Sequence, residues 1–204
     1  MDVRAKRSGT RFSRSHGFSM VELAVSLAIL IILTGMAIPA LTQSLRAYQL
    51  NDAATRLSDI LKFTRYEAVR RNTTVDFRVK QNGTAWNIWT DWDKDGVMDP
   101  TEKQSVIAGF VTLLPAGSTG LPGPNSISAS LGVAPPALDP SRSGANGFIR
   151  FDARGALTPL LNAFILYVGS STNIQYGFRA VVLLPSGATQ VWSAPQGGTW
   201  VRVS

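Results

Sequence analysis

An apolar run near the amino terminus constrains this chain more than any other feature. It extends from Phe18 to Leu41, 24 residues, and carries a single charged side chain, Glu22. A helix needs roughly 20 mainly apolar residues to cross the hydrocarbon core of a bilayer, so this run is long enough to span a membrane. A carboxylate in hydrocarbon costs about 2.5 to 3.5 kcal/mol on insertion scales. Glu22 therefore either reaches the headgroup region or has a function inside the membrane.

A basic segment precedes this run. Residues 1–16 contain five basic side chains and one acidic one: Arg4, Lys6, Arg7, Arg11, Arg14 and Asp2. Positive residues beside a span are retained on the cytoplasmic side, so the part of the chain after the span is expected on the other side. A secretory signal peptide has its small-residue cleavage site after a shorter apolar core. Here the small residue, Gly17, stands before the apolar run.

This order resembles the class III leader of type IV pilins and type II secretion pseudopilins. The matching residues are Gly17, Phe18 and Glu22, and Pro39 stands where many pilins have a helix-bending proline. The resemblance implies that prepilin peptidase cuts after Gly17, that Phe18 becomes the N-methylated first residue, and that Glu22 serves filament assembly. A buried Glu22 carboxylate needs a partner, and the free amine of a processed Phe18, on the same or a neighbouring chain, can supply one.

The same resemblance predicts location and partners. The chain is expected to cross the inner membrane once, with a periplasmic carboxyl-terminal domain, and to be incorporated into a pilus or pseudopilus. Its expected partners are prepilin peptidase and other major and minor pilins or pseudopilins. Residues 1–17 are then the leader peptide, and residues 18–41 the transmembrane helix.

Composition sets the outer limits. The chain has 204 residues, of which 45% are hydrophobic, so it has material for one membrane helix and one soluble domain of modest core. The formal net charge is +7, and the leader contributes +4 of it. The positive charge is thus mainly a signal for the orientation of the chain in the membrane. It does not imply nucleic-acid binding. Because there is no cysteine, disulfides, Cys-ligated zinc and thiol nucleophiles are excluded.

Helical spacing continues beyond Pro39. Apolar residues recur at intervals near three, four and seven, as on one helix face: Leu50, Ala53, Ala54, Leu57, Ile60, Leu61 and Ala68. Charged residues between them are expected on the polar surface: Arg46, Arg56, Lys62, Arg65, Glu67, Arg70 and Arg71. We therefore expect one helix from Phe18 to about Arg71, whose amphipathic continuation, residues 42–72, packs on a soluble domain.

Two later stretches resemble the GspH/FimT family of type IV pilin-like proteins. Leu61–Phe77 looks like that family's helix-to-first-strand junction, where an Ala-Arg-Ser-Glu-Ala-like stretch precedes a basic helix end, although Phe63 and Thr64 replace the small residue. Residues 148–159, FIRFDARGALTP, are similar to the family's Phe-Asp-x-x-Gly segment. The resemblance implies an α+β fold, with the long helix packed on an antiparallel β-sheet domain at residues 73–204.

Strand signals begin after the helix. From Val75 to Lys80 apolar and charged residues alternate, and the turn pair Asn82-Gly83 leads into a second strand, Ala85 to Thr90, which predicts a β-hairpin. The tryptophans of this region do not share one parity. Trp86 and Trp92 fall on one side of the strand and Trp89 on the other, so we expect them to pack on both faces of a sheet.

The rest of the domain reads as strands around one long loop. Ser105 to Leu114 is predicted as a third strand, and the Pro/Gly/Ser-rich segment 115–147 as a surface loop. Further strands are expected at Phe148 to Ala153, Phe164 to Val168, Gly177 to Leu184 and Thr189 to Ser193.

An acidic segment lies between the second and third predicted strands. Its side chains fit a calcium loop at positions 1, 3, 5, 9 and 12, with Gly96 at position 6: Asp91, Asp93, Asp95, Asp99 and Glu102. An EF-hand needs a helix on each side, whereas strands flank this segment. The pattern therefore indicates either a calcium site or a solvated acidic turn, and calcium is the one cofactor that the sequence suggests.

Catalysis finds no support in the sequence. The one histidine, His16, belongs to the leader, and neither a Ser/His/Asp set nor a Gly-rich phosphate loop is recognisable. We therefore expect a structural subunit rather than an enzyme.

The alternative is a DNA-binding minor pilin for natural transformation. Some FimT-like minor pilins share a Gly-Arg-x-Arg motif on a carboxyl-terminal hairpin, where arginines can contact phosphates. The corresponding turn here, Gly187 to Gln190, lacks both arginines, and Arg179 and Arg202 lie elsewhere. Nucleic acid is therefore not an expected partner.

Overall fold

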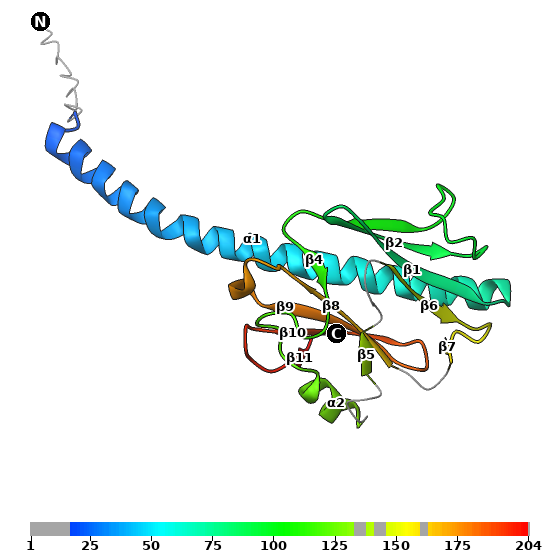
Figure 1. The fold of residues 1–204 in the computed structure, drawn as a ribbon. Helices are drawn as coiled ribbons and strands as arrows, with labels where there is room; N and C mark the ends of the chain where they lie inside the picture. Colours follow the sequence, from blue (N-terminus) through cyan, green and yellow to red (C-terminus); the bar gives the residue numbers. More distant parts are fainter. Residues whose placement is uncertain (1–16, 133–137, 141–145, 160–162, 204) are drawn as a thin grey trace, which may run out of the picture. The chain divides into compact units, whose positions relative to one another are not determined.

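A computed structural model describes residues 17–132, 138–140, 146–159 and 163–203 (Figure 1). The chain divides into two compact units, residues 1–41 and residues 42–204. Most of the predicted leader, including His16, lies outside the described residues.

One helix, α1, covers Met20–Arg71, 52 residues, and confirms the predicted long helix. Its last turn is basic, with Arg70 and Arg71 close to the carbonyl end of the helix dipole. Asn72 then adopts a φ of 50°, and the amide of Thr73 donates to the carbonyl of Ala68 at 3.2 Å. Asn is one of the few residues that readily takes this left-handed conformation, so it ends the helix.

The predicted apolar face of the second half of α1 is buried along its whole length. Each of its seven residues is at most 6% exposed: Leu50, Ala53, Ala54, Leu57, Ile60, Leu61 and Ala68. The prediction was wrong for Glu67, which is 7% exposed rather than part of the polar surface. It is buried because Arg70 and Arg71 reach back over the helix end and compensate its charge.

The strands form two sheets rather than one. Sheet A is entirely antiparallel, in the order β3-β2-β1-β6-β7. Its strands are β1 Val75–Asn82, β2 Ala85–Asp91, β3 Gln104–Ile107, β6 Asn146–Phe151 and β7 Leu157–Thr158. The predicted first hairpin is confirmed, because β1 and β2 pair with Asn82 opposite Ala85 around Gly83.

Sheet B has the order β11-β10-β9-β8-β4, all antiparallel, while β5 adds a parallel pairing to β8. Its strands are β4 Thr112–Leu114, β5 Leu138–Pro140, β8 Ala163–Gly169, β9 Phe178–Leu183, β10 Thr189–Ala194 and β11 Val201–Arg202. A short 3-10 helix, η2, covers Ile174–Tyr176 between β8 and β9.

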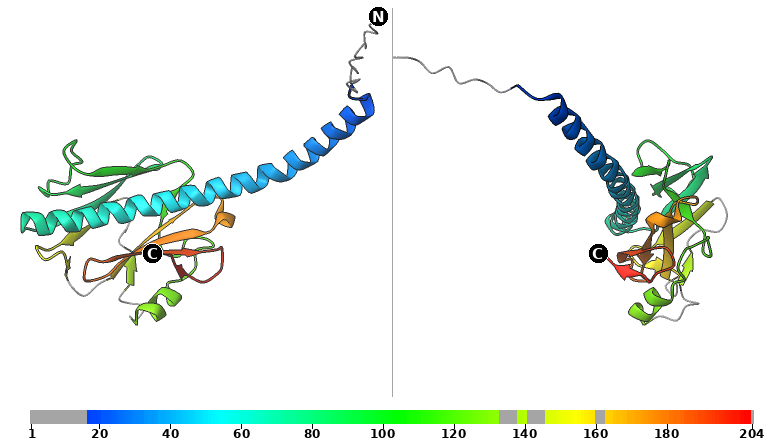
Figure 2. Two further views of the ribbon diagram at one scale, coloured as in Figure 1. Left: turned by 180° about the vertical axis from the view of Figure 1, so that it is seen from behind. Right: turned by 90° about the vertical axis from the view of Figure 1, so that its left-hand side faces the viewer.

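Both sheets pack on the second half of α1 (Figures 1 and 2). Their shared core contains Leu57 of the helix, Phe77 and Ile88 of sheet A, and Val168 and Val181 of sheet B. The amino-terminal limit of the buried core is Leu50 among the described residues. Residues 42–204 therefore contain a complete core of their own and are expected to fold without the apolar segment.

A second core lies on the other face of sheet B. There Ile127 of helix α2, Asn125–Leu131, packs with Tyr167 and Trp200. The Trp200 indole N–H donates to the carbonyls of Pro122 and Gly123, at 3.2 and 3.1 Å. Burial raises the pKa of Tyr167 to about 12. Sheet B is thus covered on both faces.

Two predicted elements differ from the structure. The single strand predicted at Ser105 to Leu114 is divided, because Gly109 turns the chain with a φ of +80° and sends β3 into sheet A and β4 into sheet B. The predicted surface loop 115–147 contains α2 and β5. Its few apolar residues, such as Ile127, complete the second core, which a local composition argument does not reveal.

Candidate functional site

The amino-terminal end of α1 has a local explanation that the sequence analysis missed. The Ser19 hydroxyl accepts a hydrogen bond from the Glu22 amide at 3.1 Å, and the Leu23 amide donates to the Ser19 carbonyl at 3.1 Å. Ser19 and Glu22 have the Ser-x-x-Glu spacing of a capping box, which the sequence alone contains. A carboxylate in the first turn is also favoured by the helix dipole. The backbone amide of Glu22 thus helps to start the helix, whereas the predicted role in assembly concerns its carboxylate.

The apolar side chains that follow Glu22 are exposed along the first half of α1. Ser26 and Thr34 satisfy their hydroxyls within the helix by donating to the carbonyls of Glu22 and Leu30, each at 2.7 Å. Every backbone polar group must find such an internal partner in hydrocarbon, and only helices and closed barrels provide this across a bilayer. α1 is long and apolar enough to cross a membrane. This segment is a membrane anchor for the domain that follows.

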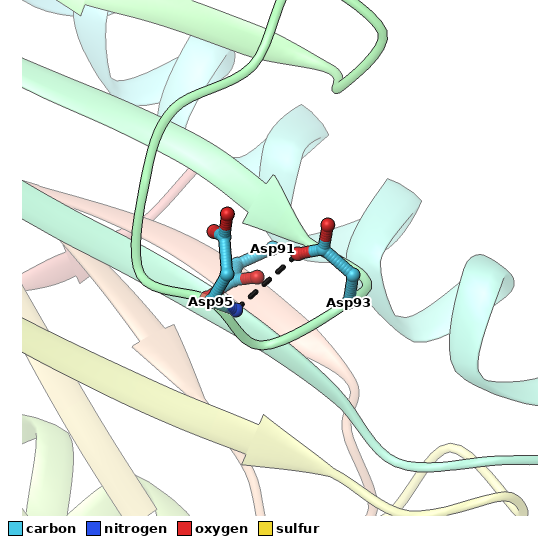
Figure 3. A group of neighbouring side chains, drawn as sticks. All are labelled: Asp91, Asp93 and Asp95. Carbon is cyan, nitrogen blue, oxygen red and sulfur yellow. Dashed lines mark hydrogen bonds between the residues drawn. The ribbon is translucent and has the colours of Figure 1, made fainter.

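The acidic segment gathers three of its five predicted ligands. Asp91, Asp93 and Asp95 each bring one carboxylate oxygen within 4.8 Å of the others (Figure 3). The Asp95 amide donates to the Asp93 carboxylate at 3.3 Å. Asp93 and Asp95 are exposed, whereas Asp91 is fully buried at the end of β2.

Asp91 is already compensated by arginine. It pairs across the strands with Asp76, also fully buried, and the two like charges are held together by Arg78 and Arg150. Arg150 binds Asp76 through two hydrogen bonds of 2.7 and 2.8 Å, and the Arg78 Nε donates to Asp91. Burial raises the pKa of Asp91, against the lowering effect of Arg78. This network is not predictable from the sequence alone, because it depends on strand register.

Glu102 lies outside the cluster of three aspartates. Its two oxygens accept the amides of Trp92 and Asp99, at 3.1 and 3.2 Å, so the side chain closes the turn. Burial raises the pKa of Glu102. The residues therefore fit a calcium loop only in part: Asp93 and Asp95 are open to a cation, Asp91 shares its charge with Arg78, and Glu102 is engaged by the backbone.

The Phe-Asp-x-x-Gly segment forms a turn that contacts α1. The Asp152 carboxylate accepts the amides of Ala156 and Arg154, at 2.8 and 2.9 Å, and the Ala156 amide lowers the pKa of Asp152 most. The Arg65 Nε donates to the Gly155 carbonyl at 3.1 Å. A Cβ added at Gly187 would lie 2.0 Å from the same carbonyl, so the turn at Gly187 needs its glycine. This part of the family pattern positions the sheets against the helix.

The two basic residues considered for DNA contact, Arg179 and Arg202, differ in their exposure to solvent. Arg179 on β9 is half-buried and donates to Asn51 at 2.6 Å, and its burial lowers its pKa. Arg202 on β11 is exposed. Arg179 therefore has a packing role, and the turn from Gly187 to Gln190 itself contains no arginine.

An apolar anchor helix that continues into a domain of two sheets defines a pilin-like α+β protein. The chain belongs to the GspH family, described as type II transport protein GspH, whose model matches residues 53–203. A second model, the prokaryotic N-terminal methylation motif, matches residues 12–38 and thus includes Gly17, Phe18 and Glu22.

Comparison with solved structures finds the type IV minor pilin FimU of Pseudomonas aeruginosa. It is 15% identical, with a TM-score of 0.43 over 77% of this chain and 94% of that one. A similarity of this size adds nothing to the family assignment. No curated protein sequence matches the chain.

Proposed function

We propose that this chain is a minor pseudopilin or minor pilin, a structural subunit of a type II secretion pseudopilus or a type IV pilus. Its family membership supports this role directly. The observation that carries the proposal is the exposed apolar first half of α1, which starts two residues after the Gly17-Phe18 junction and continues into the core helix of the domain.

In this proposal the chain is made as a precursor with a leader at residues 1–17. Prepilin peptidase removes the leader and methylates the new amino terminus at Phe18. Residues 18–41 then hold the subunit in the inner membrane, and the domain formed by residues 42–72 and 73–204 lies in the periplasm. Assembly transfers the apolar helix from lipid to a bundle of helices from other pilins.

Glu22 has a defined part in that transfer. Removing an uncompensated carboxylate from the headgroup region into a helix bundle is costly, so it needs a positive partner. The amine of a processed Phe18 is such a partner, and an uncleaved precursor lacks it. Cleavage and assembly are thereby linked through one ion pair.

The alternative to this structural role is DNA capture. In that case the chain would be a DNA-binding minor pilin for natural transformation. It needs phosphate contacts that the turn Gly187 to Gln190 does not offer. The partially buried Arg179 does not replace them, because its guanidinium is already used by Asn51.

Mass spectrometry of the purified native protein tests the main proposal. We expect the mature chain to begin with N-methylated Phe18 and to remain in the membrane fraction before assembly. A matched precursor with Gly17→Leu should keep its leader, because a bulky side chain replaces the glycine at the cut. A native amino terminus downstream of Leu41, as ordinary signal peptidase would leave, would contradict the proposal.

A further inference from the structure

The chain contains two Asn-Gly pairs, and both lie at ends of strands of sheet A. Asn82, followed by Gly83, is the last residue of β1, and Asn146, followed by Gly147, is the first residue of β6. In an Asn-Gly pair the backbone nitrogen of the glycine can attack the side-chain amide of the asparagine, because glycine has no side chain that hinders the approach. The two pairs share this chemistry, so the fold decides how fast each reacts.

Strand register places the two glycine amides differently. Successive residues of an antiparallel strand direct their backbone N–H and C=O groups alternately to the two neighbouring strands. The Thr90 amide donates to the Lys103 carbonyl at 2.9 Å, in register with the pairs of β2 and β3, so the even-numbered residues of β2 face β3. The odd-numbered residues of β2 then face β1, where their partners have even numbers. The odd-numbered residues of β1 therefore face β6.

Gly147 is held in the sheet by this register. Its partner in β1 is Val79, an odd-numbered residue, so the Gly147 N–H points at the Val79 carbonyl. The preceding residue, Asn146, is paired with Lys80. Reaction at this site would first require the end of the pairing between β1 and β6 to open.

Gly83 lies outside both strands, in the turn between Asn82 and Ala85. Within the described part of the chain its amide donates no hydrogen bond, and the Asn82 side chain makes none. Both residues are exposed, and a Cβ added at Gly83 would meet no atom within 4 Å. The attacking nitrogen and the amide it attacks are therefore both accessible to water and uncovered by other side chains.

We propose that Asn82 is a site of spontaneous deamidation in the folded protein. The Gly83 nitrogen loses its proton and attacks the Asn82 Cγ, so a C–N bond forms, the Cγ–Nδ2 bond breaks and ammonia leaves. Water then opens the resulting succinimide ring at either of its two carbonyls, which leaves aspartate or isoaspartate at position 82. One amide and one water thus become one acid and one ammonia, and no other reactant takes part.

The conformational cost of this reaction differs between the two pairs. Ring closure needs rotation about the Cα–C bond of the asparagine. At Asn82 that rotation disturbs only the pair with Ala85 that closes the hairpin. Such an opening at a loop end costs much less free energy than an opening of paired strands. Folding therefore protects Asn146 and leaves Asn82 reactive.

The product changes the charge and the shape of the hairpin end. The new carboxylate lies two positions after Lys80 and so on the same face of β1. Isoaspartate also adds one methylene to the main chain, which shifts the pair that closes the hairpin. Gln81, Gly83 and Thr84 line a cavity of about 340 Å³, so the modification alters the border of that cavity.

Peptide mapping by mass spectrometry tests the proposal on the purified full chain, kept in mild detergent near neutral pH. Trypsin releases residues 81–94 and 143–150, each of which contains one Asn-Gly pair. In the folded chain we expect peptide 81–94 to acquire the mass change of deamidation at least about tenfold faster than peptide 143–150, a factor equivalent to about 1.4 kcal/mol of opening free energy. In the urea-unfolded chain the two peptides should react at similar rates.

Matched variants locate the reaction. Asn82→Gln keeps the amide on a longer side chain that closes the ring much more slowly, so the mass change of peptide 81–94 should disappear. Asn87→Gln makes the same substitution within the same peptide and should leave the rate unchanged. These readouts do not depend on leader cleavage, so they fail or succeed separately from the proposed function.

Several outcomes would overturn the inference. They are the absence of deamidation in peptide 81–94 of the folded chain, equal rates for the two peptides in the folded chain, and an unchanged rate in Asn82→Gln. A difference between the two peptides that persists in urea would also overturn it, because local sequence rather than the fold would then set the rates.

Discussion

At the residue scale, Glu22 combines two interactions that substitution can separate. Its backbone amide donates to Ser19, its side chain has the capping-box position, and its carboxylate is the proposed partner of a processed amine. Glu22→Gln keeps a capping-box residue and removes the charge, whereas Glu22→Ala removes both. We expect both variants to insert in the membrane and to retain the folded domain, but to be depleted from complexes pulled down with other minor subunits. If Gln restores normal incorporation, the role of Glu22 is only to start the helix.

Glu67 is a residue whose charge should matter for stability. The Arg70 guanidinium, which donates to the carboxylate at 2.7 to 3.2 Å, lowers the pKa of Glu67 from 4.5, while burial opposes this. A lowered folded pKa contributes stability above pH 4.5 that is lost as pH falls through the folded value. Glu67→Gln should therefore lower the free energy of unfolding by about 1 kcal/mol at neutral pH, and by less in acid. Urea unfolding of residues 42–204 at several pH values measures this.

Asp59→Asn is the matched control for that prediction. Asp59 lies on the same helix, is 60% exposed and pairs with Lys62 at 4.0 Å. An exposed pair of this length contributes little, so the control should be neutral within about 0.5 kcal/mol at every pH. Equal effects of the two substitutions, or a Glu67→Gln effect that grows in acid, would contradict the importance of the buried charge.

At the element scale, the loop from Asp91 to Glu102 is the place to test for a cation. Asp93 and Asp95 repel each other without one, and calcium would relieve that repulsion. Because Arg78 already compensates Asp91, we expect a weak site of the extracellular type, with a Kd of about 10⁻⁴ to 10⁻³ M. Calcium at the Kd should add about 0.4 kcal/mol to the free energy of unfolding, and a hundredfold excess about 2.7 kcal/mol.

Thermal unfolding of residues 42–204 with calcium, magnesium or chelator measures this effect. The double variant Asp93→Ala, Asp95→Ala should lose the response to calcium while keeping the Arg78 and Asp91 contact. If calcium and chelator give the same midpoint in the unmutated domain, the loop is only a solvated turn.

The elements also show how far sequence reasoning reaches. The apolar face of α1 and the first hairpin were predictable, because helical spacing and the Asn82-Gly83 turn are local signals. The split between β3 and β4 was not, because one glycine turn within an apolar run decides it. α2 was missed because Ile127 is buried by distant residues such as Trp200. The ion pairs of Asp76 and Asp91 with Arg78 and Arg150 were also not predictable, because they depend on how neighbouring strands are aligned.

At the scale of the whole molecule, charge and its distribution decide whether nucleic acid is a partner. Removal of residues 1–17 reduces the formal net charge from +7 to +3. Several remaining basic side chains pair with carboxylates within the domain: Arg56, Lys62, Arg70, Arg71, Arg78, Arg150 and Arg154. DNA affinity rises with the number of Lys and Arg side chains that contact phosphates, because each contact releases counterions. A cation that already pairs with a carboxylate is less available for such a contact. These ion pairs lower the number of cations that a chain without residues 1–17 could offer to phosphates.

We therefore predict that the domain binds DNA weakly at most. Such binding should be non-specific and should weaken as the salt concentration rises. In a gel-shift with double-stranded DNA at near-physiological salt, residues 42–204 should bind with a Kd no tighter than about 10⁻⁴ M. Arg202→Gln removes an exposed cation on β11 and should change little, since one phosphate contact accounts for about one unit of the salt slope at most. Arg179→Gln is a less clean probe, because it also breaks the hydrogen bond to Asn51. Micromolar or tighter binding that Arg202→Gln abolishes would favour DNA capture over a purely structural role.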